Sequence, residues 1–149
     1  MTASGREPIT PMTPNDTIPT IRVVAGALFD AHGRVLIAQR PAGTHMAGRW
    51  EFPGGKLNAG ESELEALRRE LLEELGVRLE GAERMLELAH DYPERRVELC
   101  MWRVTAYQGE PRTLVGQSLK WVAPSELGRE DLLEADRPIV TALQGCTRR

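Results

Sequence analysis

The sequence predicts an α/β fold in which a mixed β-sheet lies between helices. Three observations support this fold class. A length of 149 residues suits one domain with a real core. An apolar content of 41% and a charged content of 28% are ordinary for a globular protein. Finally, β-rich segments are interspersed along the chain with two helix-like segments, which favours one sandwich of layers.

The first 19 residues predict a disordered tail. They contain four prolines among Thr, Ser, Gly and Asn, a composition that buries little apolar surface. They also lack the apolar run of a secretory signal. We therefore expect one folded domain over residues 20–146.

Strands and turns follow from alternation and from turn residues. Residues 21–29 are β-rich, residues 31–33 form a turn, and residues 34–39 predict the returning strand. Residues 41–60 are rich in glycine and proline, which predicts a loop. Residues 84–90 and 96–107 alternate as strands around a turn from Tyr92 to Arg95.

The remaining elements are helical, apart from a short strand at residues 118–122. Ser62 and Glu65 form a capping box and Gly76 supplies a stop, which predicts a helix between them. A helical turn is expected at residues 124–127. The last helix is expected to run from near Asp136 towards Gln144, with Asp136 where an N-cap belongs.

The helix after Ser62 carries an apolar stripe beside an acidic cluster. Its leucines recur at helical spacing and predict the face that packs on the sheet: Leu64, Leu67, Leu71 and Leu75. Glu70, Glu73 and Glu74 are spaced i, i+3 and i+4, so their carboxylates gather on one side. Such a cluster is either a solvated acidic face or an oxygen-only site suited to Mg²⁺ or Mn²⁺.

The residues in front of this helix favour the metal site. Gly55, five residues, Glu61, seven residues and then Arg69-Glu70-Leu71-Leu72-Glu73-Glu74-Leu75-Gly76-Val77 match the signature G-x5-E-x7-R-E-U-x-E-E-x-G-U, where U is aliphatic. At ordinary residue frequencies, a chance match is on the order of 10⁻⁷ or rarer. The chain thus resembles the Nudix hydrolases of the MutT type from about residue 21 to residue 143.

The resemblance implies a Nudix fold, an α/β/α sandwich, and a Mg²⁺-dependent activity, with Mn²⁺ as a possible substitute. The reaction would cut a nucleoside triphosphate into a monophosphate and pyrophosphate. The implied metal ligands are Glu70, Glu73, Glu74 and the Gly54 carbonyl, and Glu70 would also deprotonate the attacking water. Arg69 would pair with Glu73, whereas Glu61 and Lys56 would hold the loop.

The resemblance also implies a nucleotide-binding loop before the signature. Arg40 and His45 match positions that contact the phosphates, a role suited to a guanidinium and an imidazole N–H. Arg95 matches a residue beside the base, although an exposed turn charge remains an alternative for it. The remaining candidates for substrate contact are Glu51, Phe52, Pro53, Gly54 and Asp136; Phe52 is also a candidate core residue.

Two positions depart from the family pattern. Val115 stands where MutT proteins have a further glutamate ligand, so the site would hold fewer ions or use another group, such as Glu98 or Glu110. Asp136 stands where they read 8-oxoguanine with an asparagine. An ionised Asp only accepts hydrogen bonds, whereas a buried Asp with a raised pKa regains a donor. The alternative role for Asp136 is the helix cap alone.

These departures leave the base open. The leading hypothesis is a sanitising enzyme for oxidised nucleotides such as 8-oxo-dGTP. The alternatives are a (d)CTP or 5-methyl-dCTP pyrophosphatase and, less favoured, a non-catalytic Nudix base-recognition module.

Charge and composition predict the setting of this activity. A net charge of −3 argues against binding of duplex nucleic acid. No run approaches the ~20 apolar residues that span a membrane. Cys100 and Cys146 lie far apart, which fits a reducing cytoplasm. We expect a monomer or weak dimer.

Overall fold

The computed structural model describes residues 18–146, so the tail expected over residues 1–19 lies mostly outside the described residues. The elements follow in the order β2 (Thr20–Ala27), β3 (Val35–Gln39), β4 (Trp50–Glu51), β5 (Gly54–Lys56), α1 (Glu63–Leu75), β6 (Arg78–Tyr92), β7 (Arg95–Gln108), β8 (Leu119–Val122), the 3₁₀ turns η2 (Pro124–Arg129) and η3 (Glu134–Asp136), and α2 (Arg137–Cys146).

The strands form two sheets. The larger sheet has the order β5-β2-β7-β6, and it is mixed because β2 and β7 run parallel while the other pairs are antiparallel. The smaller sheet, β4-β3-β8, is antiparallel. Residues 34–39 were expected to return along residues 21–29. Only the bridge from Phe29 to Val35 pairs these segments, and β3 then continues in the other sheet.

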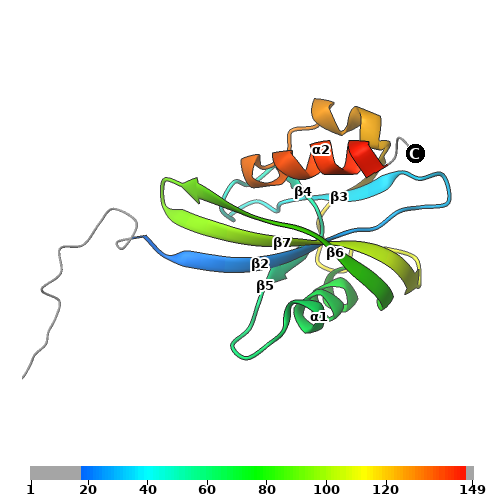
Figure 1. The fold of residues 1–149 in the computed structure, drawn as a ribbon, viewed down its shortest axis with the longest axis horizontal. Helices are drawn as coiled ribbons and strands as arrows, with labels where there is room; N and C mark the ends of the chain where they lie inside the picture. The colour runs from blue at the N-terminus through cyan, green and yellow to red at the C-terminus, as the bar shows by residue number, and fades with distance from the viewer. Residues whose placement is uncertain (1–17, 147–149) are drawn as a thin grey trace, which may run out of the picture.

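The layers confirm the predicted α/β sandwich. Figure 1 shows α1 on one side of the larger sheet, and α2 with η2 on the other side, near β3 and β4. Successive residues of a strand point to opposite faces, and β2 follows this rule. Val24 joins the core beside α1, whereas Ala25 and Ala27 join the core beside α2.

Helix α1 forms as its sequence predicts. The Ser62 hydroxyl accepts the Glu65 N–H, and the Glu65 carboxylate accepts the Ser62 N–H, which completes the capping box. Leu67, Leu71 and Leu75 are fully buried, while Leu64 is half-buried against the same core. The chain leaves the helix through Gly76 with φ of +72°, a conformation that favours glycine.

The first turn of α1 is also fixed to the larger sheet by Glu63. Its carboxylate accepts hydrogen bonds from Arg84, Trp102 and the Cys100 thiol. The bond with Arg84 is the main cause that lowers the Glu63 pKa to about 2. This network holds the N-terminal end of the helix that bears the acidic cluster.

Several strands depart from the sequence-based expectation. Residues 41–60 contain the short strands β4 and β5, although their glycines and prolines predicted a loop. β5 consists of Gly54, Gly55 and Lys56, and it pairs with β2 through its backbone. Because two of its three residues are glycines, it shows no alternation of apolar and polar side chains from which a strand could be predicted. β6 and β7 extend beyond the predicted ranges, and register shifts near Gly81 interrupt the alternation there.

No helix within residues 18–146 has both the length and the apolar character needed to cross a membrane.

Candidate active site

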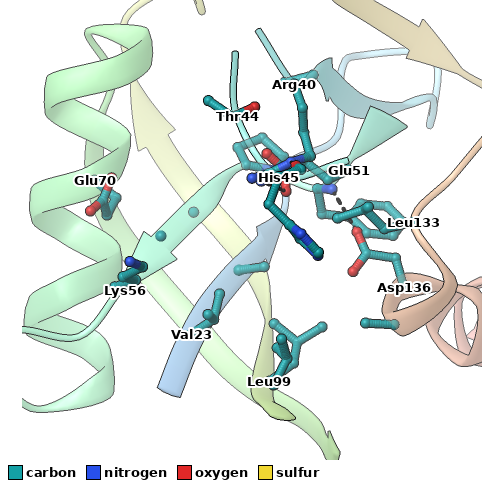
Figure 2. A pocket seen from close by; sticks show the side chains of 18 of the residues that line it. Val23, Arg40, Thr44, His45, Glu51, Lys56, Glu70, Leu99, Leu133 and Asp136 are labelled. Carbon is teal, nitrogen blue, oxygen red and sulfur yellow. Dashed lines mark hydrogen bonds and ion pairs between the residues drawn. The ribbon is translucent and has the colours of Figure 1, made fainter. Parts of the chain in front are cut away.

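One pocket of about 410 Å³ collects most of the predicted site residues (Figure 2). Its walls come from β2, β5, β7, α1, the loop after β3, and the segment before α2. The predicted residues that line it are Arg40, His45, Glu51, Phe52, Pro53, Gly54, Glu70, Glu74, Arg95 and Asp136. Arg69 and Glu73 do not line it. The pocket therefore joins the acidic side of α1 to the start of the last helix.

The acidic end of the pocket is formed by Glu70 and Glu74. Burial, and then the hydrogen bond to Glu70 and its charge, raise the pKa of Glu74 to about 9. The charges of Glu51 and Glu73 act in the same direction. Two carboxyls this close cannot both ionise without a neutralising partner. The site is built to take up positive charge.

Two glycines of the signature allow β5 to approach its neighbours. A Cβ on Gly54 would lie 2.0 Å from the backbone oxygen of Val24, so no other residue fits against β2. A Cβ on Gly55 would lie 2.4 Å from the Glu70 carboxyl carbon. The glycines thus bring the backbone of β5 directly against the acidic end of the pocket.

Arg69 orders the carboxylates from outside the pocket. Its guanidinium binds both oxygens of Glu61, at 2.7 and 2.8 Å, and contacts Glu70 at 2.9 Å. The pairing with Glu73 predicted from the sequence is longer, at 3.5 Å, and Glu73 is largely exposed. Arg69 also donates to the Lys56 carbonyl. Arg69 therefore ties α1 to the loop in front of it.

Arg40 closes the loop that carries His45. Its Nε donates to the His45 carbonyl, and its Nη1 donates to Glu51 at 3.0 Å. Burial raises the pKa of Glu51, an effect that the Arg40 charge opposes. Arg40 thus lines the pocket while it binds the His45 carbonyl and the Glu51 carboxylate.

His45 and Arg95 bring unpaired nitrogen atoms to the pocket. Figure 2 shows the His45 ring pointing into it. Within residues 18–146, His45 Nε2 and Arg95 Nε are buried and have no hydrogen-bond partner. Burial and the charges of Arg95 and Arg40 lower the pKa of His45, which favours a neutral imidazole. Buried polar nitrogens normally have partners, so these two are available to a ligand.

Asp136 lies at the opposite end of the pocket from the acidic pair. It is 5% exposed, and its Oδ2 accepts the N–H of Phe52 at 3.1 Å (Figure 2). Burial, and then the charge of Glu51, raise its pKa to about 8. Asp136 ends the turn η3 before α2 begins at Arg137, and the N–H that its carboxyl accepts belongs to Phe52, 84 positions earlier in the chain. The carboxyl is therefore a buried group between β4 and the pocket, which the helix-cap interpretation did not anticipate.

Sequence reasoning missed two polar residues of the pocket. Gln117 is 7% exposed, and within the described part of the chain its Oε1 is buried without a partner. Tyr92 is 4% exposed, and its hydroxyl accepts the N–H of Ala135 at 3.0 Å. Tyr92 ends β6 and Gln117 lies just before β8, and a single polar residue beside a strand end gives no sequence signal that it faces a pocket.

Comparison with known proteins places this geometry in a family. The NUDIX domain model matches residues 24–142. The 8-oxo-dGTP diphosphatase of Escherichia coli is 32% identical over 83% of this chain and 96% of its own. The CTP pyrophosphohydrolase of the same organism is 38% identical over 82% of this chain and 90% of its own. A structure from a study of MutT from Aliivibrio salmonicida and Vibrio cholerae is 33% identical, with a TM-score of 0.75 over 85% of this chain and 98% of that one.

The chain is a Nudix hydrolase. It belongs to the MutT-like members and is a hydrolase of phosphoric anhydrides. Nudix hydrolases generally need divalent metals.

The acidic end of this Nudix hydrolase suits such an ion. Among residues 18–146, no three acidic, His or Cys side chains already converge on one metal position. The donor set is nevertheless appropriate, because Glu70 and Glu74 both line the pocket and offer only oxygen ligands, and Glu70 lies directly against the backbone of β5. Burial raises the Glu74 pKa most and the repulsion from Glu70 adds to it; this repulsion is relieved when a cation binds. The residues present fit a hard divalent cation.

Val115 is the residue at which the family resemblance implies a gap in the ligand set. It lines the pocket and is 58% exposed. Neither substitute suggested from the sequence lines the pocket: Glu98 lies 3.8 Å from Arg22, and Glu110 is also outside the lining. Besides Glu70, Glu74 and Asp136, the pocket is lined by the carboxylate of Glu51, which the sequence had indicated as a substrate contact.

Proposed function

We propose that this Nudix hydrolase is a Mg²⁺-dependent pyrophosphohydrolase that sanitises oxidised nucleoside triphosphates such as 8-oxo-dGTP. The single observation that carries the proposal is a pocket with a carboxylate pair at one end and a buried acid at the other. The similarity to 8-oxo-dGTP diphosphatases supports it. Phosphates would lie at the α1 end and the base beside Asp136.

The raised pKa of Asp136 supports an oxidised purine. A neutral carboxyl has one donor and one free acceptor. The 8-oxoguanine edge offers an N7–H donor beside the O6 acceptor, and the neutral acid matches both. An ionised carboxylate would accept from N7–H but repel O6. Unmodified guanine lacks the N7–H, so the same acid would discriminate against it.

A second candidate is (d)CTP or 5-methyl-dCTP. The edge of cytosine also pairs a donor, its 4-amino group, with an acceptor, N3, so a neutral Asp136 matches it as well. The 38% identity to a CTP pyrophosphohydrolase favours this candidate. A non-catalytic base-recognition module is disfavoured because the acidic pair on α1 is intact.

The mechanism assigns separate tasks to the two ends of the pocket. Glu70, Glu73, Glu74 and the Gly54 carbonyl would hold Mg²⁺, which neutralises charge on the phosphoryl oxygens when bound. Glu70 would accept a proton from the attacking water as the water oxygen bonds to phosphorus. The phosphorus attacked is one of the two that flank the oxygen bridging the α- and β-phosphates; its bond to that oxygen breaks, and the monophosphate and pyrophosphate leave. Arg40 and His45 would orient the phosphates.

The oligomeric state, the cellular location and the domain bounds expected from the sequence are part of this proposal. We propose that the protein is a monomer or weak dimer. We also propose that it works in a reducing cytoplasm, because Cys100, the cysteine whose side chain the structure describes, is a free thiol. A net charge of −3 supports free nucleotides as substrates in preference to duplex nucleic acid. The domain is proposed to span residues 20–146.

The test is pyrophosphate release with Mg²⁺ across a panel containing 8-oxo-dGTP, dGTP, dCTP, 5-methyl-dCTP and CTP. We expect the highest kcat/KM for 8-oxo-dGTP, with monophosphate and pyrophosphate in equal amounts. A preference for the cytosine nucleotides would select the second candidate. Glu70→Gln serves as the matched inactive control, since it keeps the size of the side chain. Absence of turnover with every triphosphate would overturn the proposal.

A further inference from the structure

The segment that carries Asp136 is anchored on two sides. On the first side it follows β4. The Trp50 N–H donates to the Asp131 carbonyl, and the Leu133 N–H donates to the Trp50 carbonyl, both at 2.9 Å. The Phe52 N–H then donates to Asp136 itself. β4 therefore fixes this edge of residues 131–136 through its backbone.

The second anchor is the hydroxyl of Tyr92, at the end of β6. It accepts the N–H of Ala135, the residue directly before Asp136, at 3.0 Å in a buried setting. The turn η3 also contacts β6 through His90, whose Nε2 lies 3.4 Å from Glu134. Because Ala135 is 3% exposed, its N–H has no access to water if the hydroxyl is removed.

The Tyr92 ring is itself held in place. It packs edge-on against His45 at 5.3 Å and against His90 at 4.6 Å between ring centroids. The ring is almost fully buried, so the hydroxyl has little freedom to move away from Ala135. Tyr92 thus links the loop that carries His45 to the segment that carries Asp136.

We propose that Tyr92 is a positioning residue for base selection, whose hydroxyl holds Ala135 and thereby aims the Asp136 carboxyl into the pocket. This inference rests on the proposed function, because it takes Asp136 as the group that meets the base. Without the hydroxyl, the segment keeps its β4 anchor but loses the buried bond next to Asp136. The carboxyl then meets the base in a wider range of orientations, and discrimination between bases falls.

The chain offers a matched control in Tyr107. Its hydroxyl also bonds to the backbone, donating to the Phe29 carbonyl at 3.1 Å, and Tyr107 does not line the pocket. Tyr92→Phe and Tyr107→Phe therefore each remove one hydroxyl that bonds to the backbone and keep the ring. A purely structural role for Tyr92 would make the two variants equivalent.

The experiment measures Kd for 8-oxo-dGMP and dCMP by calorimetry in wild type and in both Phe variants. Steady-state kinetics on the triphosphates and melting curves accompany the titrations. Tyr92→Phe should shrink the wild-type preference between the two bases by about 2- to 10-fold, the effect of one misdirected hydrogen bond. KM should rise while kcat stays within about twofold, because the α1 end is untouched. Tyr107→Phe should leave the preference unchanged.

A double variant, Tyr92→Phe combined with Asp136→Ala, tests whether Tyr92 acts through Asp136. If Tyr92 acts through Asp136, then adding Tyr92→Phe to Asp136→Ala changes the preference no further. Equal preferences in Tyr92→Phe and wild type, or full additivity with Asp136→Ala, would overturn the positioning role while leaving the hydrolase intact. Failure of the proposed function is seen separately, as absence of pyrophosphate release by wild type.

Discussion

Replacing Asp136 by Asn tests the chemistry at the base end of the pocket. The carboxyl is 5% exposed and its pKa is raised from 3.8 to about 8, mainly by burial. At pH 7 the carboxyl is therefore mostly protonated, so the wild-type side chain already offers a donor and an acceptor. Asn offers both at every pH. Its amide oxygen also replaces Oδ2 as acceptor of the Phe52 N–H.

The pH dependence of kcat/KM carries the test, because it reports the ionisation of the free enzyme. We expect the Asn variant and wild type to turn over 8-oxo-dGTP within about threefold of each other at pH 7. As the pH rises through about 8, the wild-type carboxyl loses its donor. The ratio of variant to wild type should then increase, reaching about 5- to 150-fold, the value of one base-reading hydrogen bond. Taking the ratio at each pH cancels the titration of substrate and metal site.

Stability gives an independent readout with a defined sign. Between pH 3.8 and about 8 the folded state holds a proton on Asp136 that the unfolded chain has released, so stability falls as the pH rises through this window. One pH unit corresponds to about 1.4 kcal/mol, so at pH 7 this cost approaches about 4 kcal/mol. Asp136→Asn should therefore raise the Tm at pH 7 and little at pH 4. If the kcat/KM ratio stays constant from pH 6 to 9.5, Asp136 does not read the base through its proton, and the reasoning fails.

Three further variants test the other parts of the structure. Glu74→Gln should reduce kcat by at least about 100-fold, or about 2.7 kcal/mol, and weaken Mn²⁺ binding measured by electron paramagnetic resonance; full activity would remove the acidic end from the mechanism. Arg40→Ala should raise KM for triphosphates by several-fold to about 100-fold, with a smaller change in kcat. An unchanged KM would show that Arg40 only connects His45 to Glu51 and does not bind phosphate. Glu63→Gln should cost about 2 kcal/mol of unfolding free energy in urea at pH 7. Because the Glu63 pKa is lowered to about 2, this difference should be full above about pH 4.5 and vanish as the pH falls towards 2; a gap that persists there would contradict the ionic origin.

The sequence predicts most accurately the part of the site that is local in the chain. The capping box of α1, its leucine stripe and its glycine stop all lie within the span from Ser62 to Gly76, and the structure confirms each of them. Periodicity and capping act over a few residues, so a single sequence reveals them. β5 escaped prediction for the opposite reason. Its glycines are required by contacts with Val24 and Glu70, which lie beyond the few residues over which strand alternation and turn patterns act.

Asp136 shows where reasoning from sequence stops and why. Its position before α2 is what a helix cap requires, and its place in the family pattern is that of a base-reading residue, so both interpretations fit the same residues. Two contacts distinguish these interpretations. The Phe52 N–H, 84 positions earlier, donates to the Asp136 carboxyl, and the buried Tyr92 hydroxyl accepts the N–H of Ala135, the residue before Asp136. Burial between these partners raises the pKa, and the raised pKa turns an acceptor into a donor–acceptor pair. The chemistry that would select the base is therefore a property of the packing around Asp136, and the side chain alone does not specify it.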